Sequence, residues 1–202
     1  MGFFEPESLR VVGDAHLSLD DARINPIEFN PDNYNPEIQY LLPHELTMLR
    51  KALSRMSGEQ GELGSLLAEA MDQSSETAHD NAPQEVIVAE SVVLAKRAEP
   101  YIRALGRLQI VQYPLVDSTV VTIGKRAGLR LNNKLNFSID VVGASWLYEA
   151  VRDSDVDIAS YNSPMANAVL GKSLGERVEA IINTRQTSVE VLELANMPPI
   201  VT

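Results

Sequence analysis

The sequence predicts an α+β protein, in which an antiparallel coiled-coil hairpin precedes an antiparallel β domain that carries one short helix. Two stretches repeat apolar residues at alternating spacings of three and four, and a polar segment separates them, which predicts the hairpin. Beyond Tyr113-Pro114 the period changes to short runs with alternating polarity, which predicts the β domain. The expected divisions are therefore residues 1–44, 45–113 and 114–202.

Residues 1–44 contain three Asn-Pro pairs at a spacing of five. Proline disfavours helical geometry at the preceding residue, so this segment is expected to be largely extended, with turns. It is also too apolar for a solvated linker, and we expect it to lie along a surface of its own domain or of a partner. The pairs are Asn25-Pro26, Asn30-Pro31 and Asn35-Pro36.

The hairpin is predicted from two apolar seams that flank a polar tip loop, residues 71–85. Each arm would span about 40 Å at 1.5 Å per residue. The apolar stripe on each arm is narrow, which favours a projecting coiled coil over an ordinary helical bundle. The first seam runs through Leu46, Leu49, Leu53, Met56, Gln60, Leu63, Leu67 and Ala70, and the second through Ile87, Ser91, Leu94, Ala98, Tyr101, Leu105 and Leu108.

Four residues inside the arms weaken the predicted helices. Gly58, Gly61 and Gly64 lie in the first arm, where each glycine costs about 0.5–1 kcal/mol relative to alanine. Pro100 lies in the second arm, where it removes a backbone hydrogen bond. We therefore expect the arms to bend.

The β domain is predicted from short apolar runs between turn residues. The turn at Asn132-Asn133 precedes an alternating strand, and a stretch with helical spacing follows that strand. The expected strands are Val120–Ile123, Ala127–Leu131, Phe137–Val141, Asp157–Ser160, Val178–Ile182 and Thr187–Leu194, and the helical spacing connects Trp146, Leu147, Tyr148 and Val151.

The most distinctive stretch is YNSPMANAVLGK, residues 161–172. Ser163 is a good helix N-cap and Pro164 a good first helical residue. Gly171 would end the helix after about two turns in the left-handed conformation. The stretch therefore predicts one short helix with defined ends.

The composition excludes several classes of function. The 17 basic and 28 acidic residues give a net charge of −11, which argues against direct binding of duplex DNA. The chain has no cysteine, so a disulfide framework and a thiolate metal site are excluded. No apolar run reaches membrane-spanning length and no signal peptide is evident, so we expect a cytoplasmic protein without a membrane partner.

A hairpin followed by a β domain with this motif resembles the Gre family of bacterial transcript-cleavage factors. The resemblance covers about residues 45–195 and leaves the first 44 unmatched. It implies an FKBP-like C-terminal domain that docks at the rim of the RNA polymerase secondary channel, through Asn162, Ser163 and Pro164 here. The matching residues are Ser163, Pro164, Ala168, Leu170, Gly171, Lys172, Gly175 and Glu176.

The resemblance also implies that the hairpin enters the channel and that acidic tip residues help hold a second Mg²⁺ in the polymerase active site. Such a factor has no cofactor of its own, is not itself an enzyme, and meets the RNA 3′ end only within the elongation complex. Mg²⁺ prefers oxygen ligands and retains several waters, so one or two donated carboxylates suffice.

The tip departs from the family pattern of two acids three residues apart, the second followed by Asn-Ala. Asp80 precedes Asn81-Ala82 and matches the second acid, whereas Thr77 stands at the position of the first and Glu76 lies one residue away. Asp80 and Glu76 are thus the candidate catalytic and metal-binding carboxylates. For all these tip residues, the alternative is a solvated loop in which Asp80 or Asn81 caps the second helix beside Pro83.

Three functions remain open from the sequence. The protein is an elongation factor that stimulates cleavage of backtracked RNA, or a Gre-like inhibitor that occupies the channel without cleavage, or a peptidyl-prolyl isomerase-like module. An isomerase needs an aromatic-lined apolar pocket, for which the domain offers Phe137, Trp146, Tyr148 and Tyr161. Because fold does not give function, the isomerase ranks last.

Overall fold

The computed structural model describes residues 25–74, 82–115, 118–148 and 156–198. These residues form two compact units, one of residues 49–106 and the other of residues 25–48 with 107–198. No described helix combines the length and the apolar character needed to cross a membrane.

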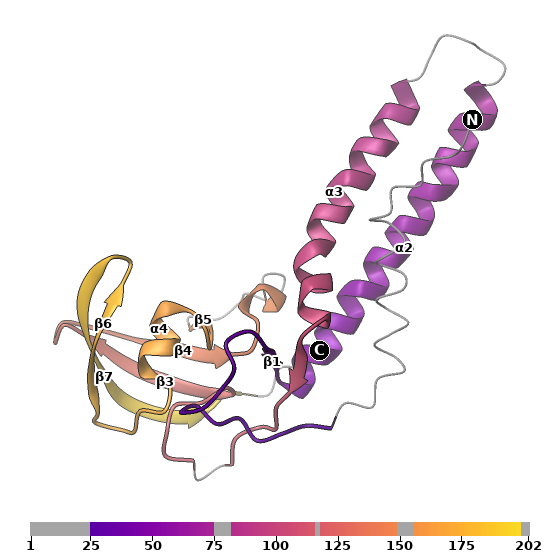
Figure 1. Cartoon of the computed structure of the whole chain (residues 1–202). Helices are drawn as coiled ribbons and strands as arrows, with labels where there is room; N and C mark the ends of the chain where they lie inside the picture. Colours follow the sequence, from indigo (N-terminus) through magenta and orange to yellow (C-terminus); the bar gives the residue numbers. More distant parts are fainter. Residues whose placement is uncertain (1–24, 75–81, 116–117, 149–155, 199–202) are drawn as a thin grey trace. The chain divides into compact units, whose positions relative to one another are not determined.

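The first unit is a helical hairpin, as predicted. Helices α2 (Pro43–Ser74) and α3 (Ala82–Leu105) run antiparallel, side by side (Figure 1). An ion pair between Glu59 and Arg97 joins the arms. Leu108, predicted to end the second seam, instead begins a strand, because α3 ends before Gly106. The core consists of Met56, Leu94 and Ala98, with Ala52, Leu63, Tyr101 and Ile102 packed against it.

The second unit contains a parallel pair of short strands and a five-stranded sheet (Figure 1). Strand β1 (Gln39–Leu41) pairs with β2 (Leu108–Ile110). The larger sheet has the order β5-β4-β3-β7-β6, and α4 (Pro164–Val169) contacts β5, β6 and β7. Its strands are β3 (Lys125–Leu131), β4 (Leu135–Val142), β5 (Asp157–Ser160), β6 (Arg177–Ile182) and β7 (Arg185–Asn196).

Two tight turns set the antiparallel part of the sheet. Asn132 and Asn133 have φ of 48° and 58° between β3 and β4, as the predicted turn requires. Asn183 and Thr184 have φ of 50° and 67° between β6 and β7. Both turns use positive φ at successive residues, which matches the right-handed twist of the strands that they join.

The structure confirms the α+β class and corrects three details. The sheet is mixed, because β5 runs parallel to β4. The predicted strand Val120–Ile123 forms only a bridge, from Val120 to Ser173, and the chain turns after it at Gly124, where φ is +90°. The predicted helical stretch after Gly143 contains a four-residue 3-10 helix, η1 (Ser145–Tyr148), and residues 149–155 lie outside the described residues.

Residues 25–42 pack on the sheet. Phe29, Tyr40 and Leu42 belong to the same buried core as the sheet residues Leu129 and Val141. The N–H of Ile27 donates to the carbonyl of Ile110 at 2.9 Å. The apolar side chains that distinguish this segment from a solvated linker are therefore used to cover the domain.

The start of α2 is fixed by a fully buried carboxylate, that of Glu45. Pro43 occupies the first helical position and Glu45 the third, from which its Oε2 accepts the N–H of Leu42 at 2.6 Å. The same carboxylate accepts the N–H groups of Gly143 at 3.2 Å and Ala144 at 3.0 Å. One side chain thus caps a helix and holds the end of β4.

Gly143 leaves the space that this contact needs. A Cβ added there would lie 2.1 Å from the carbonyl oxygen of Tyr40 and 2.6 Å from Glu45 Oε2, so no larger residue fits.

Burial raises the pKa of Glu45 to about 7, although the three backbone N–H groups and the Tyr148 hydroxyl favour the ionised form. His44 Nε2 lies 2.6 Å from that hydroxyl and its Nδ1 lies 2.8 Å from the hydroxyl of Tyr113.

The burial of Glu45 predicts a stability that falls as pH rises. The folded-state pKa lies above the ordinary value of 4.5, so this contribution is full below pH 4.5 and is lost by about pH 7. The free energy of unfolding should fall by about 3 kcal/mol across this window. In urea unfolding, Glu45→Gln should remove this slope. Glu37→Gln, at an exposed carboxylate, should keep it, and an unchanged slope in Glu45→Gln would contradict the assignment.

Candidate docking surface around the start of α4

The motif at residues 161–172 forms a tight connection between β5 and α4. The N–H of Tyr161 donates to the carbonyl of Val142 at 2.8 Å, which continues the pairing of β5 with β4. The N–H of Ser163 then donates to the carbonyl of Ser160 at 2.8 Å and turns the chain into the helix. The loop is therefore held by backbone hydrogen bonds on the strand side.

Ser163 is the N-cap of α4, as the sequence predicts. Its backbone is extended, with φ −67° and ψ 150°, and its Oγ accepts the N–H of Ala166 at 3.4 Å. Pro164 occupies the first turn, where its missing N–H costs nothing. Gly171 has φ +76° after the helix, the left-handed conformation expected there.

The three predicted docking residues are consecutive in the loop but differ in their exposure to a partner. Asn162 and Pro164 are exposed, whereas Ser163 is half-buried and its hydroxyl oxygen is engaged in the cap. The surface that this loop can offer to another protein therefore consists mainly of Asn162 and Pro164. Ser163 fixes their positions.

An aromatic cluster holds the loop from the opposite side. The ring of Tyr161 packs edge-on against Phe29, Tyr34 and Tyr40, with centroid distances of 5.8, 5.6 and 5.6 Å. Its hydroxyl donates to the carbonyl of Ile38 at 2.6 Å. Burial raises the pKa of Tyr161 to about 12, so the hydroxyl keeps its proton and remains a donor.

A second contact connects the N-terminal segment to α4 itself. Asn167, one turn into the helix, donates from its side-chain amide to the hydroxyl of Tyr34. Sequence reasoning identified the loop but not its support by Phe29, Tyr34 and Tyr40. The sequence signal that could have revealed this support is the aromatic content of the N-terminal segment that carries the Asn-Pro pairs.

The hairpin-tip carboxylates lie outside the described residues. This applies to both Asp80 and Glu76, the candidate catalytic and metal-binding residues, and to Thr77. Among the residues that the structure does describe, no group of three or more histidine, aspartate or glutamate side chains is placed to hold a metal ion.

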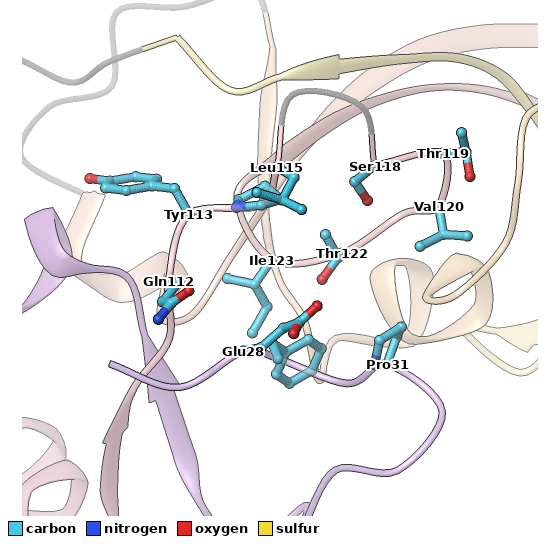
Figure 2. Close-up of a pocket in the computed structure, with 12 residues that line it drawn as sticks. Glu28, Pro31, Gln112, Tyr113, Leu115, Ser118, Thr119, Val120, Thr122 and Ile123 are labelled. Atoms are coloured by element: carbon cyan, nitrogen blue, oxygen red, sulfur yellow. The ribbon is translucent and has the colours of Figure 1, made fainter. Parts of the chain in front are cut away.

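The C-terminal unit also contains a pocket of about 440 Å³ (Figure 2). Glu28 and Pro31 border it from the N-terminal segment, and residues between Gln112 and Ile123 border it from the other side. None of the four aromatic residues considered for an isomerase lines this pocket, namely Phe137, Trp146, Tyr148 and Tyr161. Tyr148 and Tyr161 are instead buried. The aromatic residues that line the pocket are Phe29 and Tyr113, so it is not the pocket that those four residues would have formed.

The cap at Ser163 predicts a measurable loss of stability. Ser163→Ala removes the acceptor for the N–H of Ala166 and should lower the free energy of unfolding by about 1 kcal/mol in chemical denaturation. Ser173→Ala is a suitable control, because the hydrogen bonds described between Ser173 and Glu176 use only the backbone N–H and carbonyl of Ser173. Equal effects of the two substitutions would show that the Ser163 cap contributes nothing specific.

Comparison with known proteins supports a family for this part of the chain. The model for the family described as "Transcription elongation factor, GreA/GreB, C-term" matches residues 117–196. No curated protein sequence gives a significant match.

Several solved structures are similar to the chain. Gfh1, the GreA factor homolog 1 of Thermus thermophilus, is 21% identical with a TM-score of 0.35, and the alignment covers 79% of this chain and 99% of that one. Gfh1 of Thermus aquaticus is 19% identical with a TM-score of 0.33, covering 79% and 99%.

A GreA/GreB factor from Nitrosomonas europaea is 21% identical with a TM-score of 0.31, covering 50% of this chain and 78% of that one. Similarities at this level carry no argument about activity. The assignment depends on the family model, whose residues contain the whole motif from Ser163 to Glu176. Residues 117–196 of the chain thus match the C-terminal part of the GreA/GreB transcription elongation factors.

Proposed function

We propose that the protein binds RNA polymerase at its secondary channel and modulates elongation as an accessory factor without catalytic activity of its own. The observation that carries this proposal is the family match over residues 117–196 together with the preformed loop before α4. A loop whose backbone is already ordered loses little conformational entropy when a partner binds, which favours its use as a docking surface.

The hairpin supplies the second part of the proposal. Helix α3 has 24 residues, which correspond to about 36 Å at 1.5 Å per residue. In this proposal the hairpin enters the channel and its tip approaches the polymerase active site. The binding partner would be RNA polymerase. The protein would meet the RNA 3′ end only inside the elongation complex.

The chemistry at the tip would be performed by the polymerase. Asp80 and Glu76 are the carboxylates proposed to approach the Mg²⁺ that the polymerase supplies, since a two-metal site activates water and stabilises the leaving oxygen. Thr77 replaces the first family acid, and a hydroxyl is a weaker ligand for Mg²⁺ than a carboxylate. We therefore propose channel occupancy as the main activity, with weak stimulation of RNA cleavage.

The docking proposal predicts that adding positive charge to the exposed loop prevents binding. Asn162→Arg combined with Pro164→Arg should abolish co-purification with RNA polymerase, because both side chains are exposed. The substitutions leave the Ser163 cap in place, so the domain should still fold. Gln186→Arg adds charge at an exposed position near the β6–β7 turn and should bind normally. Wild-type binding by a folded double variant would refute the docking surface.

The tip proposal predicts opposite effects of two substitutions in stalled, backtracked elongation complexes. Asp80→Ala should reduce any RNA cleavage while leaving inhibition of nucleotide addition unchanged. Thr77→Asp should increase cleavage, because it restores two acids three residues apart. Strong cleavage that survives loss of both Glu76 and Asp80 would show that other residues reach the metal.

A further inference from the structure

The hairpin has an open apolar groove on one face, between α2 and α3. The groove has a volume of about 590 Å³. Three of its apolar side chains remain largely exposed: Leu66 at 49%, Val86 at 57% and Val93 at 63%. Leu63 and Leu94 form its floor and connect it to the hairpin core.

The positions of these residues match the packing of a third helix. Val86 and Val93 are seven residues apart on α3, so they lie on one face of that helix. From Val86 to Arg97 the groove follows α3 for about 16 Å at 1.5 Å per residue, or about three turns. Two adjacent ridges of this length form the kind of groove into which one apolar helix face packs.

A row of small residues flanks the groove on α2. Gly58, Gly61 and Ser65 border a shallow depression of about 700 Å³ on the other side of Leu66. A Cβ added at either glycine would meet nothing within 4 Å, so packing within the described part of the chain does not require glycine there. The absence of side chains would let the backbone of another helix approach closely.

The charges around the groove determine which occupant fits. Three glutamates line it, and Arg97 pairs with one of them, Glu59. Glu62 and Glu90 form no ion pair with any described residue. The rim is therefore negative, and a helix with cations beside its apolar face would be attracted to it.

The same charges disfavour two occupants from this protein. In a dimer that packs groove against groove, the glutamates of one copy would face the glutamates of the other. Residues 1–24 carry five acidic side chains and two arginines, so their charge also opposes the rim. A partner from a different chain remains.

We propose that this face of the hairpin binds an amphipathic helix of another protein, one with apolar residues along one side and lysine or arginine on both flanks. The apolar side would occupy the groove beside Leu66, Val86 and Val93. The cations would lie against Glu62 and Glu90. This inference does not rest on the proposed docking of the C-terminal domain to RNA polymerase.

The test uses the full-length protein and two synthetic helical peptides of about 18 residues, long enough to span the groove. One peptide has leucine and alanine on one face and lysine on both flanks, and the other has glutamate in place of every lysine. Titration calorimetry should detect binding of the lysine peptide, which added salt weakens, and a loss on the order of tenfold for the glutamate peptide.

Two matched pairs of variants locate the site. Val86→Ser should weaken binding of the lysine peptide, whereas Val88→Ser, 51% exposed but outside the groove, should not. Gly61→Leu should block the row of small residues, whereas Gly64→Leu, equally open but outside that row, should not.

Five outcomes would overturn the proposal. They are no binding of the lysine peptide, equal binding of both peptides, and equal effects within either pair of variants. The fourth is binding that requires deletion of residues 1–24, which would make that segment the occupant. A dimer in sedimentation measurements that Val86→Ser dissociates would likewise assign the groove to a second copy.

Discussion

The second unit depends on the burial of one carboxylate, that of Glu45. Its two oxygens accept three backbone N–H groups, from Leu42, Gly143 and Ala144. The contact joins the first turn of α2 to the end of β4, two segments that are far apart in sequence. A buried charge without hydrogen bonds would be strongly destabilising, so the three donors and the missing side chain at Gly143 are conditions for this arrangement.

The candidate docking loop before α4 depends in turn on the N-terminal segment. Without Phe29, Tyr34 and Tyr40, the ring of Tyr161 would lose its edge-on neighbours and the loop would be held from the strand side alone. Aromatic pairs of this kind contribute beyond the area that they bury. The segment is therefore part of the domain that contains the loop, although in the sequence it precedes the hairpin and the loop follows it.

Local chemistry explains which features could be predicted from the sequence. The seams of the hairpin and the Ser163 cap are set by neighbours within a few residues, and both were predicted. The pairing of β1 with β2 and the parallel placement of β5 join distant segments and leave no local periodicity. Pro43 and Glu45 did carry a local signal, a proline at the first helical position and a glutamate at the third, but only the structure reveals the partners at Gly143 and Ala144.

The parallel pair of β1 and β2 makes the hairpin an insertion within a domain. Gln39 pairs with Leu108, so the chain leaves one strand, completes both arms and returns to the adjacent strand. Bringing β1 and β2 together closes a long loop and costs conformational entropy. If the two arms pack against each other first, the ends of this loop are already close. We expect the hairpin to form before this pair does. Evolution could then lengthen or shorten both arms in step, adjusting their reach without disturbing the register of the strands.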